Sequence, residues 1–166
     1  MSPSQCADRL AILNGDVLGM AGPGRKIAGL AAVTVIRPGD MADALIDRAQ
    51  SARWRGERFK MLYALPVAEK LWDEYARLRA ESFRQGHGGK EAGDYYAANR
   101  EAMDAGAKPA WPARFNADEL SATQHAMNLA IDDPASFAAE YQNEPQQAAG
   151  DETATMTASE IAGKVS

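Results

Sequence analysis

The stretch IAGLAAVTVI (residues 27–36) is apolar almost throughout, and the turn signal RPGD (residues 37–40) follows it. The last four residues of this stretch, Val33 to Ile36, are all β-branched. A short apolar run of this kind predicts a strand buried on both faces, as in a sheet covered by helices. Asp40 then stands where a helix N-cap is expected, which predicts a helix over residues 41–50. A buried strand followed by a helix indicates an α/β fold.

Helical and strand periodicity extends this pattern along the chain. The predicted elements are a helix over 4–18, a break at Gly22-Pro23-Gly24, a strand over Phe59–Leu65, a long amphipathic helix over Ala68–Gln85, and helices over 91–104, 117–130 and about 134–142. A linker is predicted over Pro145–Thr155, and a capping box at Thr157–Glu160 predicts one short helix after it. Two strands make a thin sheet. Either further strands are hidden in the pattern, or this is the edge of a larger sheet.

Composition narrows the class of protein. The chain has 166 residues, of which 46% are hydrophobic and 25% are charged, as in one globular domain. These proportions exclude a collagen-like, coiled-coil or wholly disordered chain. No apolar run approaches the roughly 18 residues of a membrane helix, and the first eight residues do not look like a secretory signal. The single cysteine, Cys6, cannot form an internal disulfide, which favours the reducing cytoplasm. Without a membrane helix or a signal, we expect no contact with membranes.

Charge is unevenly distributed along the chain. The net charge is -5, yet residues 1–60 carry nine Lys and Arg against six Asp and Glu, whereas residues 116–166 carry one Lys against nine acids. A polyanion would therefore meet the first segment and be repelled by the last. The basic segment that stands out contains Trp54 and the candidate DNA contacts Arg48, Arg53, Arg55, Arg58 and Lys60. Such side chains neutralise phosphates, and Trp54 could stack on a base or anchor the segment.

Other candidate sites are weaker. The glycine cluster at residues 19–27 superficially matches a phosphate-binding loop, but it lacks the Lys-Ser/Thr pair and precedes a predicted strand where a helix is needed. Asp40, Asp43 and Asp47 share a helix face and could hold a divalent cation, although capping and ion pairing explain them as well. His87 and His125 have no second ligand at metal spacing, so no metal site and no catalytic residue is assigned.

Several segments, taken in order, resemble the large subunit of bacteriophage terminases, the ATP-driven motor that packages viral DNA into the capsid. The matching strings are SPSQCADRLAILNGDVLGMAGPGRKIAGL (2–30), TVIRPGDMAD (34–43), WRGERFKMLY (54–63), LWDEYARLRAES (71–82), YYAANREAMDAGAKPAWPARFNADELSATQHAMNL (95–129) and FAAEYQNEP (137–145). The resemblance covers about residues 2–146, and TASEIAGKVS (157–166) looks like its continuation. The ordered combination WPARF, EL and FAAEYQNEP is its most specific part.

The resemblance implies a fragment lying between the Walker B region of the ATPase and the nuclease domain. The expected fold is α/β, with the C-terminal strands of a P-loop ATPase-like sheet followed by a helical subdomain. Residues 1–115 would belong to the ATPase-like domain, 116–144 to a helical hinge, and 145–166 to a linker and short helix. The strand ending in Thr34-Val35-Ile36 resembles the coupling strand of the family, whose polar residue, here Thr34, senses the nucleotide state. ATP and Mg serve the full-length family, but Walker A, Walker B and the nuclease acids are absent from these residues.

The implied partners are double-stranded DNA, the terminase small subunit and the portal or prohead, in the host cytoplasm during phage assembly or from a prophage. Self-association is a further expectation, because an apolar strand without neighbours leaves an exposed edge. Two alternatives stay open: a free-standing α/β binding or regulatory module, and a small metal-dependent hydrolase using Asp40 and Asp43. A Walker A sequence in the upstream coding DNA, or nuclease acids downstream, would favour the terminase interpretation.

Overall fold

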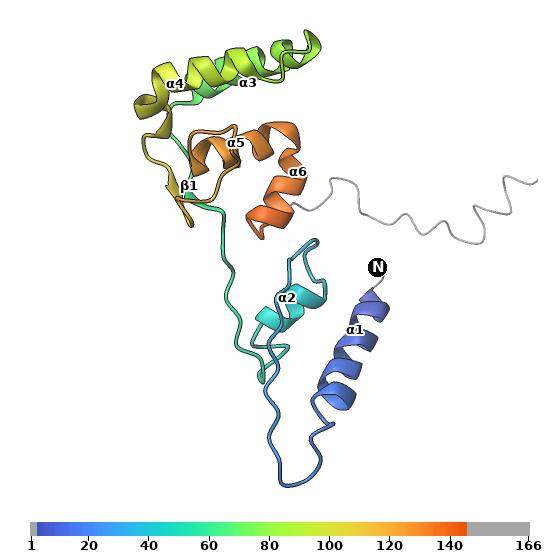
Figure 1. Cartoon of the computed structure of the whole chain (residues 1–166). Coiled ribbons are helices and arrows are strands. Elements are labelled where there is room, and N and C mark those ends of the chain that lie inside the picture. Colours follow the sequence, from blue (N-terminus) through green and yellow to red (C-terminus); the bar gives the residue numbers. More distant parts are fainter. Residues whose placement is uncertain (1–2, 146–166) are drawn as a thin grey trace, which may run out of the picture.

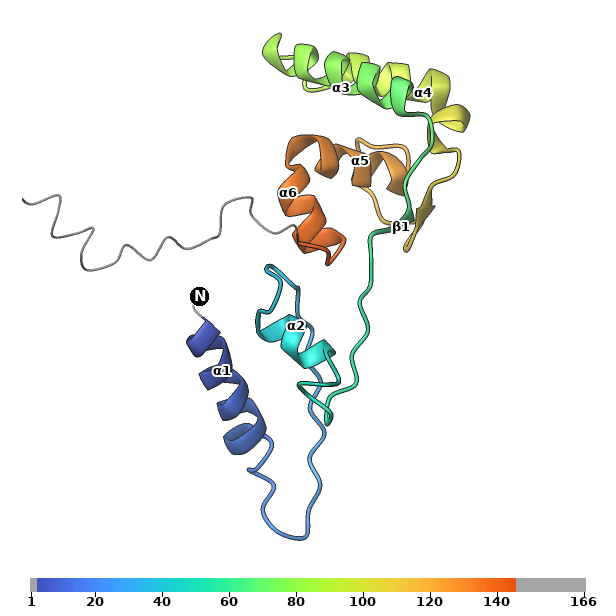
Figure 2. The ribbon, with the colours of Figure 1, turned by 180° about the vertical axis from the view of Figure 1, so that it is seen from behind.

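The computed structural model describes residues 3–145, which form an elongated molecule with helices at both ends (Figure 1). At one end, α1 (Pro3–Ile12) continues into the π-helical turn η1 (Leu13–Val17), and a long irregular stretch leads to α2 (Met41–Ile46). At the other end, α3 (Glu69–Arg84) and α4 (Lys90–Asp104) lie side by side. Between the two ends lie α5 (Ala122–Asp132), α6 (Pro134–Ser136) and the π-helical turn η2 (Phe137–Tyr141), and the view from behind shows the same order (Figure 2).

The fold is mixed α/β with a small sheet. β1 (Leu62–Ala64) pairs with β2 (Lys108–Pro109) in antiparallel fashion, with Leu62 opposite Pro109 and Ala64 opposite Lys108. The predicted strand over 59–65 is therefore confirmed only in its central residues. β2 was not predicted, because a strand of two residues has no periodicity and this one contains a proline.

The prediction of a buried strand over residues 27–36 is wrong for the described chain. These residues have no regular secondary structure, and their large side chains face solvent: Leu30 is fully exposed and Ile36 is 59% exposed. Val35 alone among them is buried. An apolar run becomes a strand only where neighbouring strands accept its backbone hydrogen bonds. The described residues supply no neighbouring strand to this stretch, so it stays irregular despite its apolar pattern.

The helix predictions are confirmed with shifted ends, and the shifts follow from side-chain caps. Asp40 caps α2 as predicted by accepting a hydrogen bond from the Asp43 N–H, 2.9 Å away. The helix ends four residues earlier than predicted, because the Asp47 carboxylate accepts the Ala49 N–H and turns the chain. The helix predicted from residue 117 begins at Ala122, where the Ser121 hydroxyl accepts the Gln124 N–H.

Two small apolar clusters form the core. Both lie in the half of the molecule that runs from β1 through α3, α4 and α5 to η2. Trp72, Tyr75 and Tyr96 pack edge to face or tilted at the α3–α4 interface, with ring centroids 5.2 to 6.1 Å apart. Met127 of α5 packs against this cluster and also against a second one around Leu62 and Phe137. Packing therefore crosses residue 115, where a domain boundary was predicted, and the boundary itself stays a prediction.

Two predictions fall mostly outside the described residues, namely the linker after Pro145 and the capping box at Thr157–Glu160. Within the described range, the helices are too short or too polar to cross a lipid bilayer.

Candidate functional site

The two ends of the basic segment 48–60 have different surroundings. At its C-terminal end, Arg58 forms an ion pair with Asp43 and donates to the Asn143 carbonyl oxygen, 3.0 Å away. Lys60 forms an ion pair with Glu144. Both cations were predicted DNA contacts, and the structure engages both in bonds within the chain. A phosphate would therefore have to compete with these carboxylates for Arg58 and Lys60.

The N-terminal part of the same segment has no such partners. Arg48, Arg53 and Arg55 are exposed, and none forms an ion pair within residues 3–145. Trp54, between two of them, is half-buried, and its indole N–H donates to the Asn14 carboxamide oxygen, 2.8 Å away. The indole thus anchors the segment to η1, which is one of the two roles predicted for it. Contact with DNA through the three arginines stays a prediction.

Thr34, the predicted coupling residue, lies on the exposed irregular stretch before α2. It lines a groove of about 550 Å³, together with Cys6 of α1 and the turn around Arg37 and Asp40. Its hydroxyl has no hydrogen-bond partner among the described residues. A side chain in this position is free to contact a ligand or another part of a larger protein.

The aspartates near α2 form no metal cluster. Asp40 accepts the N–H groups of Ile36 and Arg37 in addition to capping the helix. Asp43 accepts the Gly39 N–H, 2.7 Å away, and pairs with Arg58. The Asp47 carboxylate accepts a hydrogen bond from the Gln50 side chain, which is the main cause of its lowered pKa. No group of three metal-ligating side chains occurs in the part of the chain that the structure describes.

The segment 141–144 joins three parts of the chain, a role that sequence analysis did not assign. The Asn143 carboxamide accepts the Val35 N–H at 3.1 Å and donates to the Phe59 carbonyl oxygen at 2.8 Å. The Gln142 carboxamide accepts the Leu62 N–H at 3.0 Å and donates to the Leu62 carbonyl oxygen at 3.1 Å, as a neighbouring strand would. Two adjacent carboxamides at the end of a helical segment were the available signal, because such groups can replace backbone partners in pairs.

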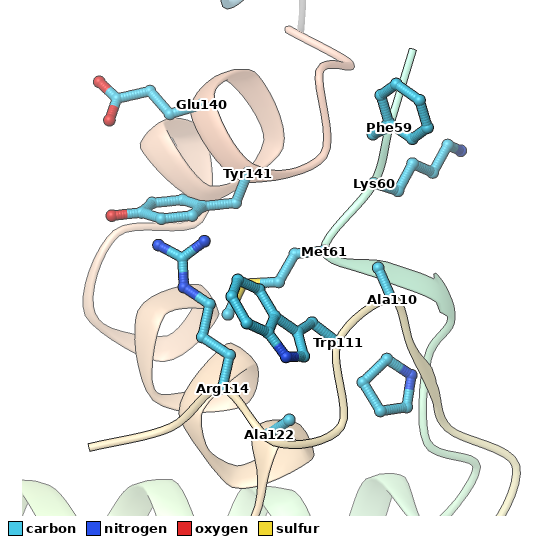
Figure 3. Close-up of a pocket in the computed structure, with 10 residues that line it drawn as sticks. Phe59, Lys60, Met61, Ala110, Trp111, Arg114, Ala122, Glu140 and Tyr141 are labelled. Carbon is cyan, nitrogen blue, oxygen red and sulfur yellow. The ribbon is translucent and has the colours of Figure 1, made fainter. Parts of the chain in front are cut away.

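A shallow groove opens where residues 59–61, the 109–114 segment and η2 meet (Figure 3). Trp111 lies beside Met61 in this groove and is 63% exposed, and Phe59 at the rim is 65% exposed. The Arg114 guanidinium lies 6.0 Å from the centre of the Trp111 ring and extends toward Tyr141. Exposed aromatic rings around a cation form a surface that could contact an apolar or aromatic group.

A buried polar network connects the segment before α5 with the helix itself. The Glu119 carboxylate accepts hydrogen bonds from the Asn116 N–H at 2.8 Å and from the Asn128 carboxamide at 2.9 Å, and it lies 2.8 Å from His125 Nδ1. On the neighbouring side, the buried hydroxyl of Tyr96 contacts Asp104 and Ser121, and burial raises the pKa of Tyr96. The polar groups of this network are one another's hydrogen-bond partners, which indicates a structural role for the string DELSATQH (residues 118–125).

Comparison with known protein families, curated proteins and solved structures finds no match to this chain.

Proposed function

We propose that this chain is a segment of a bacteriophage terminase large subunit, where it connects the ATPase sheet to the nuclease domain of a DNA-packaging motor. The ordered series of motifs carries the proposal. Contacts between those motifs support it: the segment 141–144 binds residues 58–62 through backbone, carboxamide and ion-pair contacts. Because these motifs bond to one another, they form one structural unit that could be part of a longer protein.

The exposed apolar stretch 27–36 supports the same proposal. Leu30 and Ile36 are exposed to water, and neighbouring exposed apolar side chains are typical of a surface that another protein part covers. In the proposed motor, the other strands of the ATPase sheet lie beside this stretch and accept its backbone hydrogen bonds, while Gly29 keeps its contact with Trp54. Thr34 would then stand near the carboxyl end of a sheet strand, where ligands bind in α/β proteins.

The chain is not proposed as a catalyst by itself. The turn after η1 has positive φ at Gly22 and Gly24, and no helix follows it to direct backbone N–H groups at a phosphate. Asp40 and Asp43, the alternative acids, are engaged in capping and in the ion pair with Arg58. These residues therefore do not fit a magnesium–nucleotide site, and ATP would be held by the rest of the motor.

Segment exchange tests the proposal. Residues 3–145 replace the matching segment of an intact terminase large subunit, and packaging of DNA into proheads is measured together with ATP hydrolysis. We expect packaging to be retained, and we expect Thr34→Val in the exchanged protein to lower packaging while ATP binding stays unchanged. Thr123→Val, at a buried position in α5, is the matched control for loss of a hydroxyl. A folded exchange protein that binds ATP but packages no DNA would contradict the proposal.

One observation favours a second candidate, a free-standing binding module. The groove around Trp111 and Phe59 presents exposed aromatic rings that a partner could cover. Under this alternative the chain would bind its partner without any terminase component, and segment exchange would yield no packaging.

A further inference from the structure

Two basic stretches that are distant in sequence meet at the end of the molecule farthest from α3 and α4. Lys26, from the turn after η1, and Arg53, from the basic segment, line the same open pocket of about 800 Å³. The rest of its lining is formed by Leu18, Trp54 and residues 27–29. None of these lining residues, all within the described chain, is acidic.

Close packing holds the two stretches together. The indole of Trp54 is fixed by its hydrogen bond to Asn14. Gly29 lies directly against it, since a Cβ at this position would be 3.1 Å from Leu18 Cδ2 and 3.3 Å from Trp54 Cη2. The absence of a side chain at Gly29 thus lets the backbone that carries Lys26 approach the segment that carries Arg53.

The cations at this end differ from all but one of those in α3 and α4, where Lys70 alone has no ion pair within residues 3–145. Between residues 77 and 100, every Lys and Arg has a carboxylate partner: Arg77, Arg79, Arg84, Lys90 and Arg100. Between residues 25 and 55, the cationic side chains have no acidic partner within residues 3–145: Arg25, Lys26, Arg37, Arg48, Arg53 and Arg55. Unpaired cations gathered from two stretches form a positive surface, and an extended polyanion is the ligand that such a surface attracts.

We propose that Lys26 and Arg53 bind the phosphodiester backbone of double-stranded DNA, flanked by Arg25 and Arg55. This inference rests on the proposed function and names the site at which the segment contacts its DNA. It differs from the sequence prediction in two ways: Lys26 enters the site from another stretch, and Arg58 and Lys60 leave it because Asp43 and Glu144 already pair with them. Cations on a pocket rim read phosphates and not base edges, so binding is independent of sequence.

A duplex, and not a free nucleotide, is the occupant that the geometry favours. The cations are spread along two exposed stretches, which suits a ligand with many phosphates. A nucleotide phosphate would need a compact cradle of backbone N–H groups at a helix start, and the residues after Gly24 form no helix.

The test is fluorescence anisotropy of the full chain with two duplexes of unrelated sequence over a series of salt concentrations. The double variant Lys26→Ala/Arg53→Ala is compared with Arg77→Ala/Arg84→Ala, which removes the same charge from α3. Each lost phosphate contact reduces the slope of log affinity against log salt by about 0.9, so we expect a reduction of about 1.8 in the first variant and none in the second. Both duplexes should respond equally, and millimolar ATP should not displace them beyond the effect of its ionic strength.

The inference is overturned if the parent does not bind DNA at low salt, if both double variants bind alike, or if ATP competes for the site. Circular dichroism checks that the variants fold. The single change Lys26→Ala, in an exposed turn, provides a second test with half the effect on the slope. Failure here is separable from failure of the proposed function: packaging by the segment-exchanged motor can persist with these cations removed, and DNA binding can persist in a chain that supports no packaging.

Discussion

At the scale of single residues, Asn143 connects the stretch before α2 with the chain that leads into β1. It adopts a left-handed backbone conformation, with φ of 52°, which asparagine tolerates better than most residues. In this conformation its carboxamide bonds to residues 35 and 59, and its own carbonyl oxygen accepts from Arg58. A single residue therefore fixes the stretch before α2 against the chain that leads into β1.

We expect Asn143→Ala to lower the free energy of unfolding by about 3 kcal/mol. Two hydrogen bonds at about 1 kcal/mol each are lost, and alanine in the left-handed region costs about 1 kcal/mol more. Asn143→Gly avoids the backbone cost and should lose about 2 kcal/mol. Urea unfolding followed by tryptophan fluorescence gives these values.

Asn99→Ala is the matched control, because within residues 3–145 the Asn99 side chain donates only to the Tyr95 carbonyl oxygen one turn earlier in α4. It should change stability by about 0.5 kcal/mol or less. Equal stability of the two alanine variants would contradict the role given to Asn143.

At the scale of elements, the turn between α3 and α4 depends on Glu91. Its carboxylate accepts a hydrogen bond from the Ser82 hydroxyl and lies 2.5 Å from His87 Nδ1, while Ser82 Oγ accepts the Gly89 N–H. The hydrogen bond from Ser82 is the largest cause that lowers the pKa of Glu91 from 4.5 to about 2. Ionised Glu91 therefore fixes the start of α4 against the end of α3.

The lowered pKa of Glu91 predicts an acid-dependent loss of stability. Because the folded pKa is below the unfolded value of 4.5, the stabilisation is fully present above 4.5 and is lost as the pH falls toward about 2. Glu91→Gln should flatten the decrease in unfolding free energy over this interval. Glu101→Gln, an exposed change on the same helix, should leave the decrease as in the parent. Identical acid profiles for the parent and Glu91→Gln would refute the assignment.

Some elements of this chain could be predicted from the sequence and others could not. The helix over 68–85 was predictable because the apolar side chains that it buries, such as Trp72 and Tyr75, recur on one face. The irregular conformation of residues 27–36, where a strand was predicted, was not predictable, since an apolar run indicates a need for burial and does not say whether the partner lies in the same chain. The ion pairs of Arg58 and Lys60 were equally hidden, because their partners lie 15 and 84 residues away.

At the scale of the whole molecule, the exposed apolar stretch should make the isolated chain associate. An apolar segment with unpaired backbone groups pairs with a copy of itself when its own sheet is missing. Sedimentation of the full chain should show association that increases with concentration. Leu30→Lys should abolish it, because Leu30 is fully exposed in this stretch. Leu65→Lys, at a 57% exposed position outside the stretch, should not. A parent that stays monomeric at all concentrations would count against a missing partner.

We propose that residues 27–36, which are irregular in this structure, become a sheet strand when the rest of a packaging motor supplies the neighbouring strands. Amide hydrogen exchange, measured by mass spectrometry on peptides covering residues 26–34, tests it most directly in two proteins: the dilute, monomeric chain and the segment-exchanged terminase large subunit. We expect exchange at unprotected rates in the chain alone and strong protection in the exchanged motor. Unprotected exchange of this stretch in a folded, ATP-binding exchange protein would contradict it.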